Sequence, residues 1–239
     1  MPRLEYVFSC SLMLLCAVRN TAADASCPGL VVQRQILNRG FHRDLVTRLD
    51  LHTFAEQVDS CRVHFLESIP SGLFLDPYQL SSLRQHNLTD VFLLTAVDLE
   101  APEYLATEQK ARVYAKPDPA VCAHCFSSTV PIHTRYHQPS SYFSEASITL
   151  QSPQLLIHCN KDFPPSGCTH YPLSEAPCGL EDDSLCSWLH LPYTAVPKTI
   201  IMQVPVGMTQ HKAAVCTVTI AVTLICAGMI LLAVYKHDH

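Results

Sequence analysis

Asp44-Leu45-Val46-Thr47-Arg48-Leu49-Asp50-Leu51 sets charged or polar side chains against apolar ones along one short stretch. Successive side chains of a β-strand point to opposite faces of the sheet, so this pattern predicts a strand with one face buried. Arg62-Val63-His64-Phe65-Leu66 repeats the pattern further along the chain. Both stretches therefore predict a fold that is mainly β.

Short runs of the same kind recur outward from these two. They are expected as strands at Leu30–Val32, Val91–Val97, Ala111–Ala115, Val130–Tyr136, Ala146–Leu150, Leu155–Cys159 and Lys198–Val204. Breaks that contain proline separate them, and 17 Pro against 7 Gly leave little room for long helices. Two short helices are expected, at Thr53–Asp59 and Pro77–His86. This spacing of strands and turns predicts an antiparallel, sandwich-like or barrel domain.

The segment Ala213–Tyr235 (AAVCTVTIAVTLICAGMILLAVY) contains no charged side chain. At about 1.5 Å per residue, a helix of this length crosses the roughly 30 Å hydrocarbon core of a bilayer with some tilt. Only residues 236–239 (KHDH) follow it in the sequence. We expect one transmembrane helix at residues 213–235 and a cytosolic tail at residues 236–239.

The first residues have the pattern of a secretory signal. Arg3 precedes an apolar run, Tyr6–Val18, and small residues follow at 21–25. The alternative is a buried N-terminal helix, but the downstream cysteines favour secretion. We therefore expect a signal peptide at residues 1–25 and a lumenal β-rich domain at residues 26–212, which is a type I topology.

Twelve cysteines are present, and four of them lie in the expected signal peptide or membrane helix. The remaining candidates for disulfides are Cys27, Cys61, Cys122, Cys125, Cys159, Cys168, Cys178 and Cys186. An even number of cysteines in an oxidising compartment predicts a disulfide framework, whose connectivity the sequence leaves open. Asn87-Leu88-Thr89 is an acceptor sequence for N-glycosylation, so Asn87 is expected to carry a glycan.

Charge excludes one class of partner. The chain has 16 Lys and Arg against 21 Asp and Glu, a net charge of −5, with both signs interspersed. No basic stripe is present, so no nucleic acid is expected as a partner.

Cys122-Ala123-His124-Cys125 has the spacing of a thiol–disulfide exchange site, where a histidine and a helix N-terminus lower the pKa of a thiol. The following residues, FSSTVP, instead indicate a turn and a strand. A structural pair of cysteines is favoured, and a lumenal thiol oxidoreductase that uses Cys122 and Cys125 is the alternative.

No second Cys-x-x-Cys accompanies Cys122 and Cys125 to complete a zinc site, so no metal and no cofactor are expected. No nucleophile elbow or glycine-rich phosphate loop is present. The residues therefore favour a non-catalytic protein.

Small residues recur every four positions in the apolar helix, at Thr219, Thr223 and Ala227 among others. Small side chains at this spacing allow a second membrane helix to approach closely. We expect these three residues to contact a membrane partner.

Five strings are specific when taken together. They are Gly40–Leu45 (GFHRDL), Asp76–Leu80 (DPYQL), Glu100–Leu105 (EAPEYL), Arg135–Pro139 (RYHQP) and Gln203–Gly207 (QVPVG). With the single terminal helix, they closely resemble the PIG-X family, the small subunits of glycosylphosphatidylinositol (GPI) mannosyltransferase I. The resemblance covers nearly everything from Cys27 to Tyr235.

This resemblance implies a non-catalytic lumenal subunit in the endoplasmic reticulum membrane. Such a subunit binds and stabilises PIG-M, the polytopic enzyme that adds the first mannose to the GPI precursor. Partner contacts are expected from the first and fourth strings, at Phe41, His42, Arg43, Arg135, Tyr136 and His137. The alternative for the arginines is that Arg43 or Arg135 pairs with a carboxylate such as Asp44 and braces the sandwich, which is favoured because both strings adjoin or enter predicted strands. A type I receptor-like ectodomain that binds a soluble ligand is the alternative for the whole chain.

Overall fold

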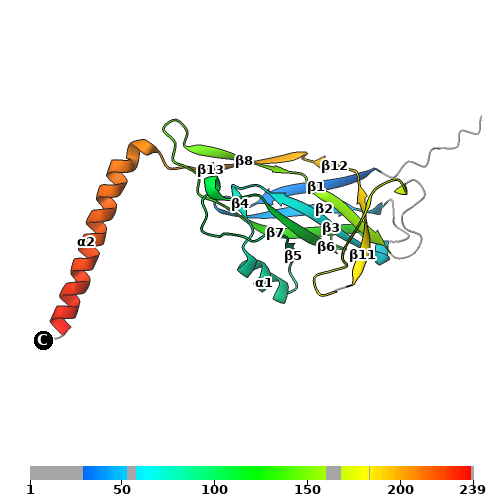
Figure 1. Ribbon diagram of the computed structural model, residues 1–239, viewed down its shortest axis with the longest axis horizontal. Helices are drawn as coiled ribbons and strands as arrows, with labels where there is room; N and C mark the ends of the chain where they lie inside the picture. The colour runs from blue at the N-terminus through cyan, green and yellow to red at the C-terminus, as the bar shows by residue number, and fades with distance from the viewer. Residues whose placement is uncertain (1–28, 53–57, 160–167, 183, 238–239) are drawn as a thin grey trace, which may run out of the picture.

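The computed structural model describes residues 29–52, 58–159, 168–182 and 184–237 (Figure 1). These residues form a β-domain and one long C-terminal helix that stands clear of it. The strands are β1 (Leu30–Leu37), β2 (His42–Asp50), β3 (Cys61–Ile69), β4 (Leu73–Phe74), β5 (Asp90–Leu93), β6 (Gln109–Pro117), β7 (Cys125–Thr134), β8 (Glu145–Gln151), β9 (Gln154–Cys159), β10 (Leu173–Pro177), β11 (Leu185–Leu191), β12 (Tyr193–Val196) and β13 (Thr199–Pro205). The helices are α1 (Pro77–Gln85) and α2 (Lys212–His237).

Eleven of these strands form one long sheet, in the order β10-β11-β9-β3-β6-β7-β2-β1-β12, with β4 added to β7 and β5 added to β6. The sheet has two halves, which are joined where β6 pairs with β7 at Lys116↔Ser127 and Pro117↔Phe126. β8 and β13 form a separate two-stranded ribbon. Side chains from both halves and from the ribbon enter one apolar core, among them Val32, Phe65, Ile132, Leu150 and Met202. This shared core makes the domain sandwich-like.

Nearly all of the pairing is antiparallel, as expected from the sequence. The exception is β12, which runs parallel to β1 from Leu30↔Tyr193 to Gln33↔Val196. This pair joins the first described strand to the segment that leads, through β13, to the membrane helix.

The predicted strands are present, although several boundaries differ. β1 and β7 are longer than expected, and β5 ends at Leu93 rather than at Val97. The sequence patterns missed β4, β10, β11 and β12, which are short or have no clear alternation. β12 has only four residues and lies between Pro192 and Pro197, so no periodicity can develop there.

Helix α1 forms where the sequence predicted it. Asp76 caps its N-terminus, because the carboxylate accepts a hydrogen bond from Tyr78 N at 2.8 Å. Pro77 occupies the first turn, where a missing N–H costs nothing. The other expected helix, Thr53–Asp59, lies largely outside the described residues, and its end, Val58–Ser60, is a 3-10 turn.

A buried ion pair connects the two halves of the sheet. The Arg34 guanidinium, on β1, donates to both carboxylate oxygens of Glu67, on β3, at 2.8 Å. It also donates to the carbonyl oxygen of Gln151, at the end of β8, at 2.7 Å. The two side chains are 1% and 3% exposed. Burial raises the pKa of the Glu67 carboxyl, and the Arg34 charge opposes this shift.

The expected disulfide framework is confirmed in the described part of the chain. Cys61 is bonded to Cys159, Cys122 to Cys125, and Cys178 to Cys186. Cys168 is also disulfide-bonded, and Cys27 lies outside the described residues. The Cys61–Cys159 bond links β3 to β9 directly across the sheet.

Helix α2 is long and apolar enough to cross a membrane, which agrees with the predicted transmembrane helix at residues 213–235. No residue of α2 is buried, and the helix stands clear of the β-domain in Figure 1. The predicted signal peptide, residues 1–25, lies outside the described residues, and so does the end of the predicted tail at 238–239.

The buried pair yields a stability prediction. Arg34→Met is expected to lower the free energy of unfolding by about 3–5 kcal/mol, because it leaves a buried carboxylate without its partner. Urea unfolding of the purified chain in detergent measures this, with Trp188 as reporter, since it is the single tryptophan and fully buried.

The matched control is Arg84→Met. This change breaks the exposed Arg84–Glu181 pair and is expected to cost about 1 kcal/mol or less. If both variants lose the same free energy of unfolding, the buried pair contributes no more to stability than the exposed pair.

Candidate functional site

A cleft of about 420 Å³ opens between the beginning of β2, β4 and the end of β7. Its walls contain residues from four of the five strings that carry the family resemblance or from their neighbours. The lining consists of Phe41, His42, Phe74, Asp76, residues 99–102, His133, Thr134, Arg135 and Tyr136.

Strand pairing brings these side chains together. β2 runs antiparallel to β7 with His42 opposite His133, and β4 pairs with β7 so that Phe74 is also opposite His133. Thr134 N donates to Phe41 O at 2.9 Å beyond the end of β2. In the turn before β2, Asn38 and Gly40 adopt positive φ of 66° and 95°, which tight turns require. The cleft is therefore a product of the sheet, with both of its aromatic walls fixed by backbone hydrogen bonds.

A continuous stack of aromatic rings and one guanidinium group forms the floor of the cleft. The Arg135 guanidinium lies 4.8 Å from the centre of the Phe74 ring. Phe74 stacks on His133 with centroids 4.9 Å apart, and His133 meets His42 edge-on at 4.4 Å. Cation–π and aromatic contacts of this kind stabilise a rigid surface.

Hydrogen bonds hold the stack in place. His133 Nε2 lies 2.7 Å from Gln79 Oε1, so α1 is tied to the floor. Arg135 donates to the carbonyl oxygen of Ala101 at 2.6 Å, which ties the loop 98–102 to the same place. Burial lowers the pKa of His133; the neighbouring His42 lowers it further, while the Asp76 carboxylate opposes the shift. His133 therefore favours its neutral form within the stack.

The rim of the cleft is aromatic and open to solvent. Tyr136 is 77% exposed, and its ring centre lies 5.5 Å from that of Phe41. Glu103 N donates to Tyr136 O at 2.9 Å, so the 3-10 turn Glu103–Leu105 supports the backbone under the rim. An exposed tyrosine beside a half-buried phenylalanine at the mouth of a cleft is typical of protein–protein contact surfaces.

Of the six ectodomain residues predicted as contacts, four line this cleft: Phe41, His42, Arg135 and Tyr136. Arg43 instead donates to the carbonyl oxygens of Gly40 at 2.9 Å and Gln203 at 2.7 Å, which ties β2 to β13. His137 is half-buried, with Nδ1 3.0 Å from Arg135 O. The string pattern thus found the rim but also included two residues with structural contacts.

The alternative prediction was that an arginine braces the sandwich by pairing with a carboxylate. It is correct about the bracing and wrong about the group that the arginines bind. Both Arg43 and Arg135 brace the domain, but they do so through backbone carbonyl oxygens. Asp44 accepts a hydrogen bond from Asn38 at 2.7 Å instead. Among the described residues, the ion pair that braces the sandwich is Arg34–Glu67, which the sequence patterns did not identify.

Sequence reasoning also missed Phe74, Gln79 and His133. Their spacing carries no motif, because β4, α1 and β7 meet only in the folded chain. The string Asp76–Leu80 was the one available signal, since it contains both the helix cap and Gln79.

The predicted membrane-helix contacts lie on α2 and are exposed. Thr223 donates its hydroxyl to Thr219 O within the same helix. The hydroxyl hydrogen is therefore already used, and Thr219, Thr223 and Ala227 offer mainly a small, smooth surface to a neighbouring helix.

Cys122 belongs to the turn that leads into β7, and Cys125 is the first residue of that strand, so neither lies at a helix N-terminus. Their sulfurs and the Asp50 carboxylate lie close together, but disulfide-bonded sulfurs are not thiolate ligands. The setting agrees with a structural pair of cysteines.

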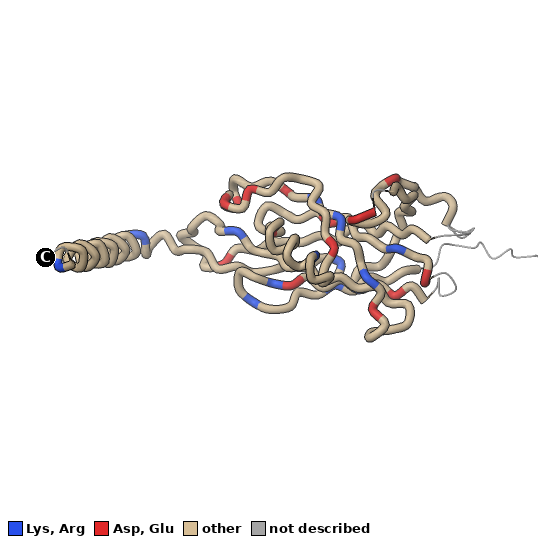
Figure 2. The backbone as a smooth tube through the Cα atoms, turned by 90° about the horizontal axis from the view of Figure 1, so that it is seen from below, with Lys and Arg blue, Asp and Glu red and all other residues tan. Residues whose placement is uncertain are grey.

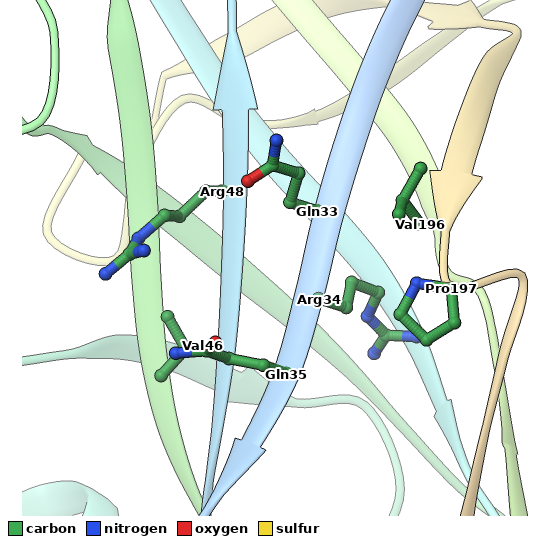
Figure 3. Close-up of a pocket in the computed structure, with 7 residues that line it drawn as sticks. All are labelled: Gln33, Arg34, Gln35, Val46, Arg48, Val196 and Pro197. Atoms are coloured by element: carbon green, nitrogen blue, oxygen red, sulfur yellow. The ribbon is translucent and has the colours of Figure 1, made fainter.

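A second hollow, of about 240 Å³, lies beside β1, β2 and the Val196-Pro197 turn (Figure 3). Its two arginines, Arg34 and Arg48, point in opposite directions, so they do not converge on one anion. Acidic and basic residues are interspersed along the backbone of the β-domain (Figure 2). The cleft at Tyr136 is therefore the better candidate for a functional surface.

These features define a class: a disulfide-bonded β-sandwich domain followed by one helix that is long and apolar enough to cross a membrane, with an aromatic cleft on the domain. The sequence matches the PIG-X / PBN1 family over residues 38–235, and the chain belongs to this family.

Similar curated proteins come from three mammals, and all carry the name GPI alpha-1,4-mannosyltransferase I, stabilizing subunit. The human protein is 40% identical over 216 residues, which are 90% of this chain and 83% of the human one. The rat and mouse proteins are 39% and 38% identical over 90% of this chain and 85% of theirs. No solved structure matches the chain.

Proposed function

We propose that this protein is the stabilising subunit of GPI mannosyltransferase I, in which it binds and stabilises a catalytic subunit of the PIG-M type. The observation that carries the proposal is 40% identity over 90% of the chain to a protein named for that role. The subunit contributes no catalytic group of its own; its role is to hold the polytopic enzyme in its folded state. Binding that favours the folded state over the unfolded state stabilises a partner by mass action.

The cleft at Tyr136 is the proposed contact for a lumenal segment of the enzyme. Its floor is held by Arg135, Phe74 and His133, so little conformational entropy is lost when a partner binds. Its rim, Phe41 and Tyr136, supplies the aromatic area that dominates binding energy in many interfaces.

A test of the cleft replaces its rim. Phe41→Ala with Tyr136→Ala is expected to weaken association with the catalytic subunit, because aromatic anchors cost about 2 kcal/mol on truncation, roughly a 30-fold loss of affinity. The measurements are co-purification of the catalytic subunit and restoration of surface GPI-anchored proteins in cells that lack this chain.

The control is Tyr78→Ala with Phe92→Ala, which removes two other exposed aromatic side chains, 77% and 49% exposed, from α1 and β5. If both double variants restore the catalytic subunit and the surface proteins as well as the wild-type chain does, the contact lies outside the cleft. Failure of the wild-type chain itself to restore the catalytic subunit or the surface proteins would refute the proposed function as a whole.

The second proposed contact is the small-residue face of α2. Thr223→Leu with Ala227→Leu is expected to reduce co-purification of the catalytic subunit, because larger side chains keep the helices apart. Ala221→Leu with Gly228→Leu enlarges two residues on a different side of the helix and serves as the matched control. Equal recovery of the enzyme with both pairs would remove α2 as a contact.

We further propose that the β-domain lies in the lumen of the endoplasmic reticulum and that Asn87 is glycosylated there. Asn87 is exposed just after α1, with a positive φ of 55°, and Lys116 Nζ donates to its side-chain oxygen at 2.5 Å.

Residence in the endoplasmic reticulum predicts that endoglycosidase H removes the glycan at Asn87, because the glycan is not processed further. Asn87→Gln is the control that identifies the band shift. A glycan resistant to the enzyme would instead favour the receptor-like ectodomain at the cell surface.

A further inference from the structure

The loop at residues 138–144 (QPSSYFS) carries two prominent aromatic side chains that the proposed function does not use. Tyr142 is 87% exposed and Phe143 is 69% exposed. The loop contains no charged residue. The two adjacent rings form a small apolar patch at the tip of one loop, and the position of the loop indicates what contacts them.

Hydrogen bonds attach this loop to the segment that enters the membrane helix. Ser140 N donates to Gly207 O at 2.9 Å, and Thr209 N donates to Ser140 O at 3.1 Å. The hydroxyls of Ser141 and Thr209 lie 2.8 Å apart. The loop and the first turn before α2 are therefore one connected unit, and Figure 1 shows them side by side.

The tip of the loop has a fixed shape. The Ser140 hydroxyl accepts hydrogen bonds from Tyr142 N at 3.1 Å and from Phe143 N at 3.0 Å. Val206 N donates to Ser144 O at 2.8 Å, which closes the base of the loop against the end of β13. The two rings are thus presented together rather than on a free coil.

The depth of this unit follows from the chain. Thr209 precedes Lys212, the first residue of α2, by one 3-10 turn, Thr209–His211. At about 2 Å per residue, Thr209 lies roughly 6 Å from the start of the helix. The headgroup layer on each side of a bilayer is about 5–7 Å thick. With Lys212 at the edge of the hydrocarbon core, Thr209 lies at headgroup depth. The Ser141 hydroxyl, which contacts Thr209, then lies at the same depth.

We propose that Tyr142 and Phe143 insert into the headgroup region of the bilayer beside α2 and thereby fix the β-domain close to the membrane surface. Tyrosine at this depth keeps its ring among apolar atoms and its hydroxyl in water. Two points of attachment, a helix and an aromatic loop, restrict rotation and tilt of the domain in a way that one helix cannot. This inference depends on α2 crossing a membrane and not on the identity of the partner enzyme.

The test uses the full chain in lipid nanodiscs, with and without brominated phosphatidylcholine, which quenches nearby tryptophan. Phe143→Trp places a reporter at the tip, and the wild-type chain supplies the background from buried Trp188. We expect the added emission to be blue-shifted and to be lost in brominated lipid.

Leu185→Trp is the matched control. Leu185 is 66% exposed at the start of β11, and Figure 1 shows this strand on the opposite side of the domain from α2. Its emission is expected to be red-shifted and unaffected by bromine. If the Phe143→Trp variant behaves like this control in lipid alone, the proposal is wrong. A blue shift of the Phe143→Trp emission that appears only when the catalytic subunit is added would also overturn the proposal, because the loop would then contact protein instead of lipid.

Discussion

The ion pair between Arg34 and Glu67 is the interaction on which the domain depends most. It joins β1 in one half of the sheet to β3 in the other, and through Gln151 O it also reaches the ribbon. Two opposite charges buried together give little net stability over an apolar pair, because both lose their hydration. If the two halves of the sheet were shifted relative to each other, however, Arg34 or Glu67 would be buried without its partner. We therefore regard the pair as a device that selects one packing of the halves.

That packing also positions the candidate contact surfaces. The end of β7 and the beginning of β2 form the cleft, and Arg43 ties this beginning of β2 to Gln203 on β13. β13 continues into the turn that starts the membrane helix. The aromatic rim at Tyr136, the loop at residues 138–144 and α2 thus lie along one continuous stretch of structure.

Local patterns identified most of the strands and α1, since alternation and helix caps depend on neighbouring residues. They did not find β4, β10, β11 and β12. β4, β10 and β12 have only two to five residues, and β12 forms by pairing with β1, which is far away in the sequence. The five family strings located part of the cleft, at Phe41, His42, Arg135 and Tyr136, but not Phe74 or His133. Those two complete the floor only because β4 and β2 pair with β7 at the same position.

The sequence by itself determined the mainly β character, the apolar helix, the capacity for disulfides and the family, because each depends on composition, short periodicity or similarity along the chain. The tertiary structure alone decided which cysteines pair, that β12 runs parallel to β1, and that Arg34 meets Glu67 across 33 positions. It also decided that Arg43 and Arg135 bind backbone carbonyls rather than Asp44. These outcomes depend on long-range packing, because a buried charged or polar group is stable only where the fold places a partner beside it, and that partner can be far away in the sequence.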